Sequence, residues 1–243
     1  MRKVIEPKFH IRQTGGMDYV RRMAAGECWS LSRFNDGEWF AILGRDDPKY
    51  HTYNNCDGHE YSPALCDALA ECLLDVSGYT YGIGGMKHHD AQAAWLESHG
   101  VEIEWHYSDS IKMMNNAGTL APFLEELRQH SVLIVGPAHL SRLGKMLRLP
   151  NYGFLGIPLK NCYLKTEDVA TWVSVQIDHR GRDVVLFSAS MATNVWIHRL
   201  WPEYGDRVWM IDCGAMWDIY AGVESRGVFR NQDWAPIIAK NLA

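Results

Sequence analysis

The most informative stretch of this sequence is Asp183-Val-Val-Leu-Phe187-Ser-Ala-Ser190, followed by residues 192–200 and then by Arg207-Val-Trp-Met-Ile211-Asp212-Cys-Gly214. Residues 183–187 are an apolar run of strand length, and the small residues after them predict a turn into a helix over 192–200. Residues 207–211 predict a second buried strand. This order of strand, turn, helix and strand is the sequence form of a Rossmann-like βαβ crossover between parallel strands.

The same alternation extends toward the amino terminus. Ser131-Val-Leu-Ile-Val135 predicts another buried strand, stopped by Gly136-Pro137, and residues 140–149 predict the helix after it. Residues 29–33 predict a strand that runs into a turn over 34–38, and residues 101–107 alternate like a further strand. Runs that are apolar on both faces are typical of a parallel sheet covered by helices. We therefore expect an α/β fold: one domain over residues 1–243 with a Rossmann-like, mostly parallel sheet flanked by helices.

Length, charge and cysteine usage restrict the class of protein. A chain of 243 residues suits one large α/β domain, and its net charge of −5 argues against tight non-specific nucleic-acid binding. The amino terminus lacks the apolar run of a signal peptide, and no stretch approaches the roughly 20 apolar residues that span a bilayer. The six cysteines include no C-x-x-C pair, so reduced thiols are expected. These features predict a cytoplasmic protein without a membrane span.

Ligands of open parallel sheets bind beyond the carboxyl ends of the strands. That rule selects four turns, at residues 35–38, 136–139, 188–193 and 212–217. None of them contains the G-x-G-x-x-G fingerprint of dinucleotide-binding proteins, and the chain has neither a phosphate-binding G-x-x-x-x-G-K-[ST] loop nor a G-x-S-x-G nucleophile elbow. A Walker-type ATPase and a serine hydrolase are thereby disfavoured.

Asp36 and Glu38 are the sharpest chemical signal, because they are two carboxylates separated by one glycine just after a predicted strand. Such hard oxygen ligands can share a Mg²⁺ or Mn²⁺ ion with a substrate diphosphate, since these ions keep few protein ligands. The alternative is that Asp-Gly is a simple turn and Glu38 is solvated. Arg33 can hold a phosphate in a bidentate manner or form an ion pair with Asp36 or Glu38. Asn35 can donate to a ligand or occupy the turn.

Four further residues are candidates because of their position. Gly136 and Ser190 lie at strand-to-helix turns, where free backbone N–H groups can receive phosphate. Asp212 ends the last predicted strand and can contact ribose, act as a base or assist a metal, although it can also cap the next turn. His139 follows Gly136-Pro137 and is a candidate for ligand contact or proton transfer.

Other side chains carry weaker signals. The adjacent His88 and His89 favour a surface pair over a metal site, because neighbouring side chains point apart. The aromatic residues Tyr50 and Tyr53, and the segment 217–220, can stack on a base or a sugar.

The segment Leu31-Ser-Arg33-Phe-Asn-Asp36-Gly-Glu38 resembles the R-F-G-D-G-E segment of the GT-D-type glycosyltransferase family. The apolar strand, the turn and helix over 187–200, and the strand ending Ile211-Asp212-Cys-Gly214 resemble the same family. Trp217-Asp218-Ile-Tyr220-Ala-Gly222-Val-Glu-Ser225-Arg226 resembles a carboxyl-terminal signature of its phage and bacterial relatives. This sequence departs from the family at Asn35, where glycine is usual, and at residues 188–190, where a glycine-rich turn is frequent.

This resemblance implies a Rossmann-like fold in which Asp36 and Glu38 hold Mn²⁺ or Mg²⁺ together with a nucleotide sugar, with Asp212 matching the family's strand-end aspartate. It implies transfer of a sugar from a nucleoside diphosphate sugar to a hydroxyl acceptor, with a UDP-sugar as the first expected donor. The acceptor can be a glycan, a glycoprotein or a hydroxymethylated DNA base. Asp218 and Tyr220 are expected to contact substrate. The base can be Asp212, Asp218 or His139.

Two other classes of protein remain open. A nucleotide-processing hydrolase or phosphotransferase would use the same metal pair without a sugar acceptor. A non-catalytic nucleotide-binding protein would keep the fold after losing catalysis, and Asn35 and the altered turn at 188–190 favour it. The oligomeric state stays open.

Overall fold

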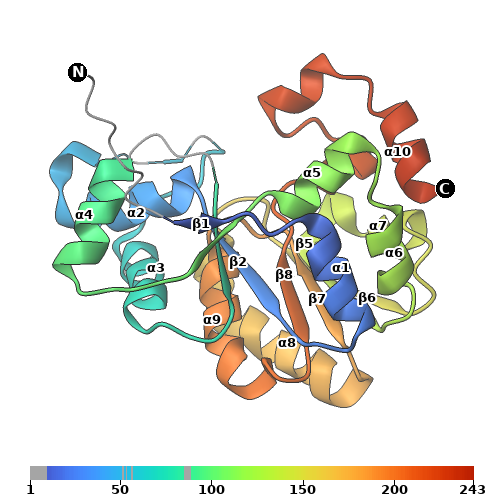
Figure 1. Ribbon diagram of the computed structural model, residues 1–243, viewed down its shortest axis with the longest axis horizontal. Helices are drawn as coiled ribbons and strands as arrows, with labels where there is room; N and C mark the ends of the chain where they lie inside the picture. Colours follow the sequence, from blue (N-terminus) through green and yellow to red (C-terminus); the bar gives the residue numbers. More distant parts are fainter. Residues whose placement is uncertain (1–9, 51, 53, 56, 85–88) are drawn as a thin grey trace.

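Eight strands form one sheet in which every pair of neighbours is parallel. The computed structural model describes residues 10–50, 52, 54–55, 57–84 and 89–243. Across the sheet the strands are β1 (Ile11–Arg12), β4 (Trp105–Tyr107), β3 (Thr80–Ile83), β2 (Ser30–Phe34), β8 (Trp209–Asp212), β7 (Val184–Phe187), β5 (Val132–Pro137) and β6 (Tyr152–Ile157). The predicted α/β class with a Rossmann-like sheet in one domain is confirmed (Figure 1).

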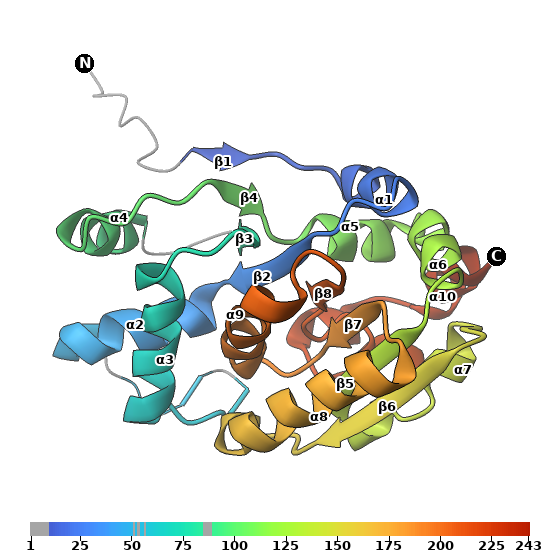
Figure 2. The same cartoon turned by 90° about the horizontal axis from the view of Figure 1, so that it is seen from below.

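Helices cover both faces of this sheet (Figures 1 and 2). One face packs against α2 (Asp36–Asp46), α3 (Pro63–Leu74), α4 (His89–Ser98), α8 (Thr166–Arg180) and α9 (Ala192–Tyr204). The other packs against α1 (Gly16–Ala24), α5 (Ser110–Ala117), α6 (Ala121–Leu127), α7 (Leu143–Met146) and α10 (Ala235–Leu242). Short 3-10 helices connect them: η1 (Pro48–Tyr50), η2 (Ala138–Leu140), η3 (Cys162–Lys165), η4 (Asp218–Ala221) and η5 (Gly227–Asn231).

The strand β5 shows why the apolar runs of the sequence become strands. Leu133 and Val135 pack into the core on the side of α8 and α9, whereas Val132 and Ile134 pack into the core on the other side. All four side chains are at most 1% exposed. A strand covered on both faces needs apolar residues at every position, so the run reads as continuous rather than alternating.

Three sequence predictions of local structure are wrong. The predicted turn at 34–38 is the end of β2 followed by the first turn of α2. Of the predicted strand at 101–107, only Trp105–Tyr107 pairs, with β1 on one side and β3 on the other. The predicted helix at 140–149 is interrupted, with η2 and the one-turn α7 in its place, and Arg148 takes a left-handed φ of 57° that ends it.

Trp39 fixes α2 against the sheet. Its side chain is 1% exposed and its ring centroid lies 6.1 Å from that of Trp95 and 6.0 Å from that of Trp105. Removing a buried aromatic side chain of this size costs about 3–5 kcal/mol. Because Trp39 follows Glu38 directly, this packing also sets the position of the carboxylates in the first turn of α2.

In the described part of the chain, no helix combines the length and the apolar character that a membrane crossing requires.

Candidate functional site

A crevice opens at the carboxyl edge of the sheet between β2 and β8. These strands are parallel neighbours, with Leu31 opposite Ile211, so both end at the same edge. After β2 the chain enters α2 on one face of the sheet, whereas after β8 it enters η4 on the other face. Connections that leave neighbouring strands toward opposite faces create the crevice in which α/β proteins bind ligands.

A cavity of about 510 Å³ occupies this crevice, and we call it the carboxylate pocket. Its acidic lining residues are Asp36, Glu38, Asp57, Asp109 and Asp212. Its basic lining residues are Arg33, Lys112 and Arg226. The five acidic side chains outnumber the three basic ones, so the pocket carries an excess of negative charge when all of them are ionised.

Arg33 lies at the centre of this charge network. Its side chain is 9% exposed, and Nη2 donates a hydrogen bond to Oδ1 of Asp109 at 2.6 Å. Burial alone would lower the pKa of Arg33, but the surrounding carboxylates, Asp212 first, raise it above its ordinary value. The expected alternative of an ion pair is therefore present, but with Asp109 as the partner rather than Asp36 or Glu38. Arg33 stays charged and neutralises part of the pocket.

Glu38 lies in the first turn of α2 and is only 8% exposed. Oε2 accepts a hydrogen bond from the backbone N–H of Asn35 at 2.9 Å, which holds the carboxylate at the helix N-terminus. Burial, and then the charge of Asp212, raises the pKa of Glu38 to about 7. The alternative of a solvated Glu38 in a simple turn is wrong, because Glu38 lies in the first turn of a helix and its side chain is buried.

Asp212 faces Glu38 from the end of β8 and is also 8% exposed. Oδ1 accepts a hydrogen bond from the backbone N–H of Gly214 at 2.9 Å, so the predicted cap of the following turn is real. Burial raises the pKa of Asp212 to about 6, although Arg33 opposes this rise. Asp212 therefore both lines the pocket and caps the turn that follows β8.

Asp36 differs from its neighbour Glu38. It is partly exposed and lines the same pocket, and within the described residues its carboxylate has no hydrogen-bond or ion-pair partner. Asn35 is held in place, since its Oδ1 accepts from the hydroxyl of Ser108 at 3.0 Å. Asp36 is thus the carboxylate of the pair that remains free to contact a ligand.

A second cavity of about 410 Å³ lies beyond the ends of β5, β6 and β7, and we call it the histidine pocket. Its polar lining includes His59, His139, Lys160, Ser188, Asp218 and Ser225. It shares Asp57, Ser190, Gly214, Ala215 and Arg226 with the carboxylate pocket. Because the two cavities share these walls, they form one cleft along the sheet edge.

His139 and Asp218 form a hydrogen-bonded pair in the histidine pocket. Nε2 of His139 lies 2.8 Å from Oδ1 of Asp218, and the Ser225 hydroxyl donates to Oδ2 of the same carboxylate. Asp218 is 6% exposed, so its charge is held by these two partners rather than by water. The structure therefore brings together two candidates from different turns of the sequence, His139 and Asp218, and adds Ser225 to their hydrogen-bond network.

The wall between the two pockets has an unusual backbone. Ser190 takes a left-handed φ of 53° and Gly214 one of 52°. A Cβ on Gly214 would stand 2.7 Å from Nη1 of Arg33, so only glycine allows Arg33 to lie this close to the turn. Such strained positions cluster at ligand sites. Ser190 accordingly lines the cleft, as its position in the sequence predicts.

Two candidate residues have structural surroundings instead. Gly136 is buried within β5, where a Cβ would stand 2.9 Å from Leu140 Cδ1, so this glycine allows close packing and lines neither pocket. Tyr220 is 3% exposed, and its hydroxyl donates to Asn115 at 2.7 Å and accepts from Asn241 at 3.0 Å. The substrate contacts predicted for these residues are corrected to packing and core hydrogen bonding. Trp217 is also fully buried.

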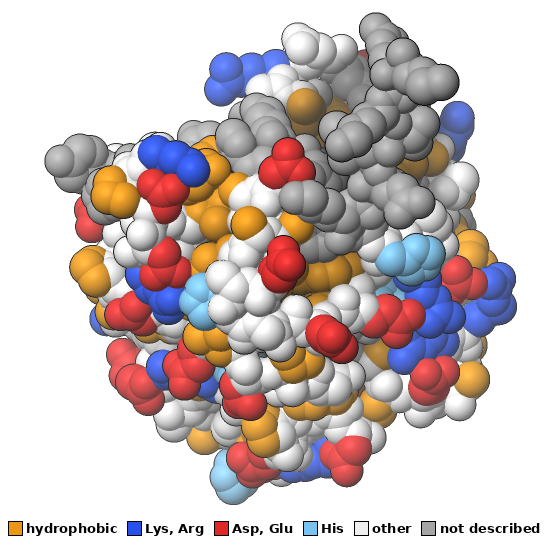
Figure 3. All heavy atoms as spheres, turned by 60° about the vertical axis from the view of Figure 1, so that its left-hand side comes forward, with side chains coloured by type: hydrophobic (Ala, Val, Ile, Leu, Met, Phe, Trp, Pro, Cys, Tyr) orange, Lys and Arg blue, Asp and Glu red, His pale blue; other side chains and the backbone are white. Residues whose placement is uncertain are grey.

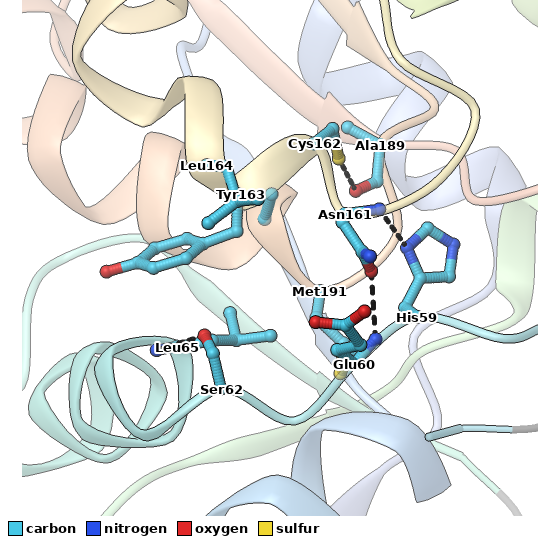
Figure 4. A pocket seen from close by; sticks show the side chains of 11 residues that line it. His59, Glu60, Ser62, Leu65, Asn161, Cys162, Tyr163, Leu164, Ala189 and Met191 are labelled. Carbon is cyan, nitrogen blue, oxygen red and sulfur yellow. Dashed lines mark hydrogen bonds between the residues drawn. The ribbon is translucent and has the colours of Figure 1, made fainter. Parts of the chain in front are cut away.

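The polar segment after η1 supplies one wall of the cleft. Oδ1 of Asn55 accepts from the backbone N–H groups of Asp57 and His59, each at 2.9 Å, which fixes this segment as a tight turn. Figure 4 shows His59 facing Asn161, whose backbone N–H donates to Nδ1 of His59 at 3.2 Å. Asp57 forms an ion pair with Arg226 across the cleft.

Of the remaining aromatic and histidine candidates, Tyr50 is described by the structure and lines neither pocket. The ring of Tyr50 lies against Lys49, with Nζ 4.6 Å from its centroid. Tyr53 and His88, as well as the side chain of His89, lie outside the described residues.

The sequence gives little sign of Asp109 and Lys112. They lie at the start of α5, and Lys112 Nζ donates to Oδ2 of Asp109 at 3.1 Å. The only local hint is an acidic residue close to the end of a predicted strand, the kind of position that made Asp212 a candidate. The pairing of Asp109 with Arg33 depends on residues 76 positions apart, which no local pattern reveals.

The donor set fits a divalent ion bound together with a substrate diphosphate. Among the described residues, no group of three or more Asp, Glu, His or Cys side chains is arranged to hold a metal on its own. Mg²⁺ and Mn²⁺ in nucleotide sites need only one or two protein carboxylates and take their other ligands from phosphate and water. Asp36 and Glu38, beside the buried Asp212, match that smaller requirement.

The architecture is that of an α/β protein with a glycosyltransferase fold. A solved domain of unknown function 1792, described as having a distinct glycosyltransferase fold, is 17% identical, with a TM-score of 0.61 over 86% of this chain and 80% of its own. A protein from Streptococcus sanguinis, described as a new glycosyltransferase of the same domain type, is 19% identical, with a TM-score of 0.61 over 87% and 84% of the two chains. No protein-family model and no curated protein matches this chain.

Proposed function

We propose that this protein is a metal-dependent glycosyltransferase that moves a sugar from a nucleoside diphosphate sugar, UDP-sugar first, to a hydroxyl acceptor. The observation that carries the proposal is the carboxylate pocket, where Glu38 and Asp212 are buried together at the switch point of the sheet. Burial raises the pKa values of both carboxyl groups, so keeping the two ionised together costs free energy that a bound cation would offset. The likeness in fold to proteins described as glycosyltransferases supports the same conclusion.

The carboxylates Asp36 and Glu38 would hold Mn²⁺ or Mg²⁺. A bound ion of this kind supplies Lewis acidity and neutralises charge on the leaving diphosphate. Lys112 and Arg226 line the same pocket and have partly exposed side chains, so they can contact phosphate oxygens. Arg33 would act on the carboxylates themselves, because it keeps Asp109 and Asp212 partly neutralised at the floor of the pocket. In the reaction the bond between the sugar C1 and the diphosphate breaks and a bond from C1 to the acceptor oxygen forms.

The charge of the chain favours a glycan or glycoprotein acceptor over a DNA base. The face in Figure 3 carries Lys and Arg side chains interspersed with Asp and Glu, without a basic stripe on that side. The whole chain bears a net charge of −5. Proteins that hold duplex DNA neutralise phosphates with clustered cations.

The test is release of nucleoside diphosphate from a panel of UDP-, GDP- and TDP-sugars, followed by mass spectrometry with Mn²⁺ and with chelator. We expect metal-dependent release that the double variant Asp36→Ala, Glu38→Ala reduces by at least about 100-fold, since it removes electrostatic stabilisation of the transition state. The exposed pair Glu102 and Glu104 has the same spacing and provides the matched double-alanine control.

The outcomes separate the three classes of function. Release to water that no hydroxyl acceptor accelerates would indicate a hydrolase. Nucleotide binding without turnover, insensitive to chelator, would indicate a non-catalytic binding protein. Neither binding nor release with any donor, in wild type and variant alike, would contradict the proposal.

A further inference from the structure

We infer that the acceptor hydroxyl binds in the histidine pocket and that His139 takes its proton, with Asp218 as the positioning residue. This inference rests on the proposed function and assigns the second half of the cleft. The histidine pocket holds about 410 Å³ and adjoins the carboxylate pocket through Ser190 and Gly214. A donor whose diphosphate lies over Asp36 would place its sugar at this shared wall, with the acceptor on the far side.

The hydrogen bonds of the pair determine where the proton of His139 lies. An ionised carboxylate can only accept hydrogen bonds, so Asp218 Oδ1 takes the Nε2–H of the ring at 2.8 Å. The Ser225 hydroxyl occupies Oδ2. This arrangement leaves Nδ1 of His139 as the basic nitrogen, and within the described residues Nδ1 has no hydrogen-bond partner. A neutral imidazole with one nitrogen fixed and the other free is arranged as a general base.

The lining of the histidine pocket suits an acceptor with both apolar and polar faces. Ile157 at the end of β6, with Pro158 and Leu159 after it, gives one apolar wall, and Leu159 is 64% exposed. Lys160 and Arg226 add positive charge on the polar side. A sugar ring or a hydroxyl-bearing peptide side chain has this mixed character.

The carboxylates of the other pocket are less suited to the proton transfer. Oε2 of Glu38 accepts from the backbone of Asn35, and Oδ1 of Asp212 accepts from the backbone of Gly214. Both also lie close to the charge of Arg33. In the proposed function Glu38 is also occupied by the metal ion, whereas Nδ1 of His139 has no hydrogen-bond partner among the described residues.

The proposed step balances as follows. The acceptor oxygen forms a bond to C1 of the donor sugar as the bond from C1 to the diphosphate oxygen breaks, and the bonding electrons leave with the nucleoside diphosphate. The hydroxyl proton passes to Nδ1 of His139. Asp218 keeps Nε2–H in place and stabilises the resulting imidazolium without accepting the proton itself.

The chain contains a matched control for His139. His130 precedes the same strand, β5, at its amino end, and its Nδ1 lies 3.7 Å from Oδ2 of Asp183. Its side chain is 21% exposed, against 22% for His139. The two histidines flank the same strand and have the same type of partner, but they lie at opposite edges of the sheet.

The experiment compares His139→Ala and His139→Gln with His130→Gln in the full-length protein. Binding of UDP with Mn²⁺ is measured by calorimetry, and turnover is measured as UDP release from a UDP-sugar to water and to p-nitrophenyl glycosides. We expect both His139 variants to bind UDP within about twofold of wild type and to lose at least about 100-fold in turnover. Added imidazole should restore part of the turnover of His139→Ala, because the cavity left by the side chain can admit the free base.

The variant Asp218→Asn tests the positioning role. It should lower kcat by at least about tenfold and leave KM for the donor unchanged, because it allows the wrong imidazole tautomer without touching the carboxylate pocket. A purely structural role would instead lower the melting temperature and leave kcat of the folded fraction unchanged.

Failure of this inference can be told apart from failure of the proposed function. Turnover of His139→Ala equal to wild type, or no rescue by imidazole, would overturn the role of His139 while donor cleavage itself stood. Binding of UDP by wild type without any turnover would also overturn it. Absence of both UDP binding and release in wild type would contradict the glycosyltransferase function, and the inference with it.

Discussion

The carboxylate pocket and the histidine pocket lie side by side on one sheet edge, yet they handle buried charge in opposite ways. In the carboxylate pocket, Glu38 and Asp212 are buried close to each other, and the pKa values of both are raised. In the histidine pocket, Asp218 is equally buried but both of its oxygens accept hydrogen bonds, from His139 and Ser225. One pocket retains an electrostatic cost that a bound cation would relieve, and the other has a completed network that orients a base.

This difference shows how one fold can combine two tasks. A pocket in which two carboxylates are buried close together favours a cationic ligand, because the cation offsets the cost of ionising both carboxylates. A pocket whose buried carboxylate is satisfied keeps its side chains in one arrangement without a ligand. The predictions below vary the charge and hydrogen bonding of each half, and they are ordered by the expected change in the free energy of unfolding.

The largest effect is expected from Arg33→Met. This variant removes the cation of the carboxylate pocket and leaves Asp109, Asp212 and Glu38 buried without it. Breaking a buried ion pair by removing one partner costs about 3–5 kcal/mol. Urea unfolding followed by circular dichroism measures the loss.

The matched control is Arg226→Met, since Arg226 pairs with Asp57 in a more exposed position, with side-chain exposures of 34% and 22%. A partly exposed pair contributes about 1 kcal/mol or less. Equal losses for Arg33→Met and Arg226→Met would show that the two halves of the cleft do not differ in buried charge.

Glu38→Gln is expected to stabilise the metal-free protein at high pH. The pKa of Glu38 rises from an ordinary 4.5 to about 7, chiefly through burial, so the folded state favours the protonated form. The contribution of this group to the free energy of unfolding is fully present below pH 4.5, and it is lost as the pH rises through 7. Glutamine cannot ionise, so the variant should gain on the order of 2 kcal/mol at pH 8 and almost nothing at pH 5.

Thermal unfolding of wild type and Glu38→Gln across this pH range, with chelator present, measures the gain. It should appear as a rise of several degrees in Tm, since about 1 kcal/mol corresponds to 2–4 °C in a chain of this size. The variant Glu125→Gln, at an exposed position of α6, is the control and should follow wild type. A gain that is constant from pH 5 to pH 8 would contradict the account of Glu38.

The smallest effect is expected from Tyr220→Phe, since Tyr220 lies in η4 and lines neither pocket. The change removes a hydroxyl that bonds to Asn115 and Asn241 and so ties η4 to α5 and α10. Loss of these buried hydrogen bonds should cost about 1–2 kcal/mol. UDP affinity and turnover should stay at wild-type values, and a changed KM for the donor would show that the ring does contact substrate.

Much of this fold could be predicted from local patterns. The helix at Gly16–Ala24 ends before Gly26, whose φ of 71° is the left-handed conformation that its position in the sequence predicts. Ser62 caps α3 and accepts from the N–H of Leu65 at 3.3 Å. The apolar runs became β5 and β7 because a parallel sheet covered on both faces accepts nothing else. The rule that ligands bind beyond strand ends selected the turns that carry Asp36, Glu38 and Asp212, and these three residues line one pocket.

Other features had a signal that a competing pattern hid. Asp36-Gly37 is a frequent turn dipeptide, and it hid the start of α2. Asn35 followed three residues later by Glu38 is the sequence form of a capping box, and the N–H of Asn35 does bond to the Glu38 carboxylate. At Tyr220 the sequence suggested a role that the structure does not support. An aromatic residue beside a predicted site suggests stacking on a ligand, but Tyr220 is buried in the core.

The sequence by itself determined the class of fold and the edge of the sheet at which the polar residues of the β2 and β8 turns meet, because hydrophobic periodicity and strand-end position are local properties of a chain. Only the tertiary structure decided how buried each charge is and which partner it has. Arg33 pairs with Asp109 across 76 residues, and His139 pairs with Asp218 across 79. Burial and long-range pairing set the charge state of these groups, and both depend on how the two faces of the sheet are covered rather than on neighbouring letters.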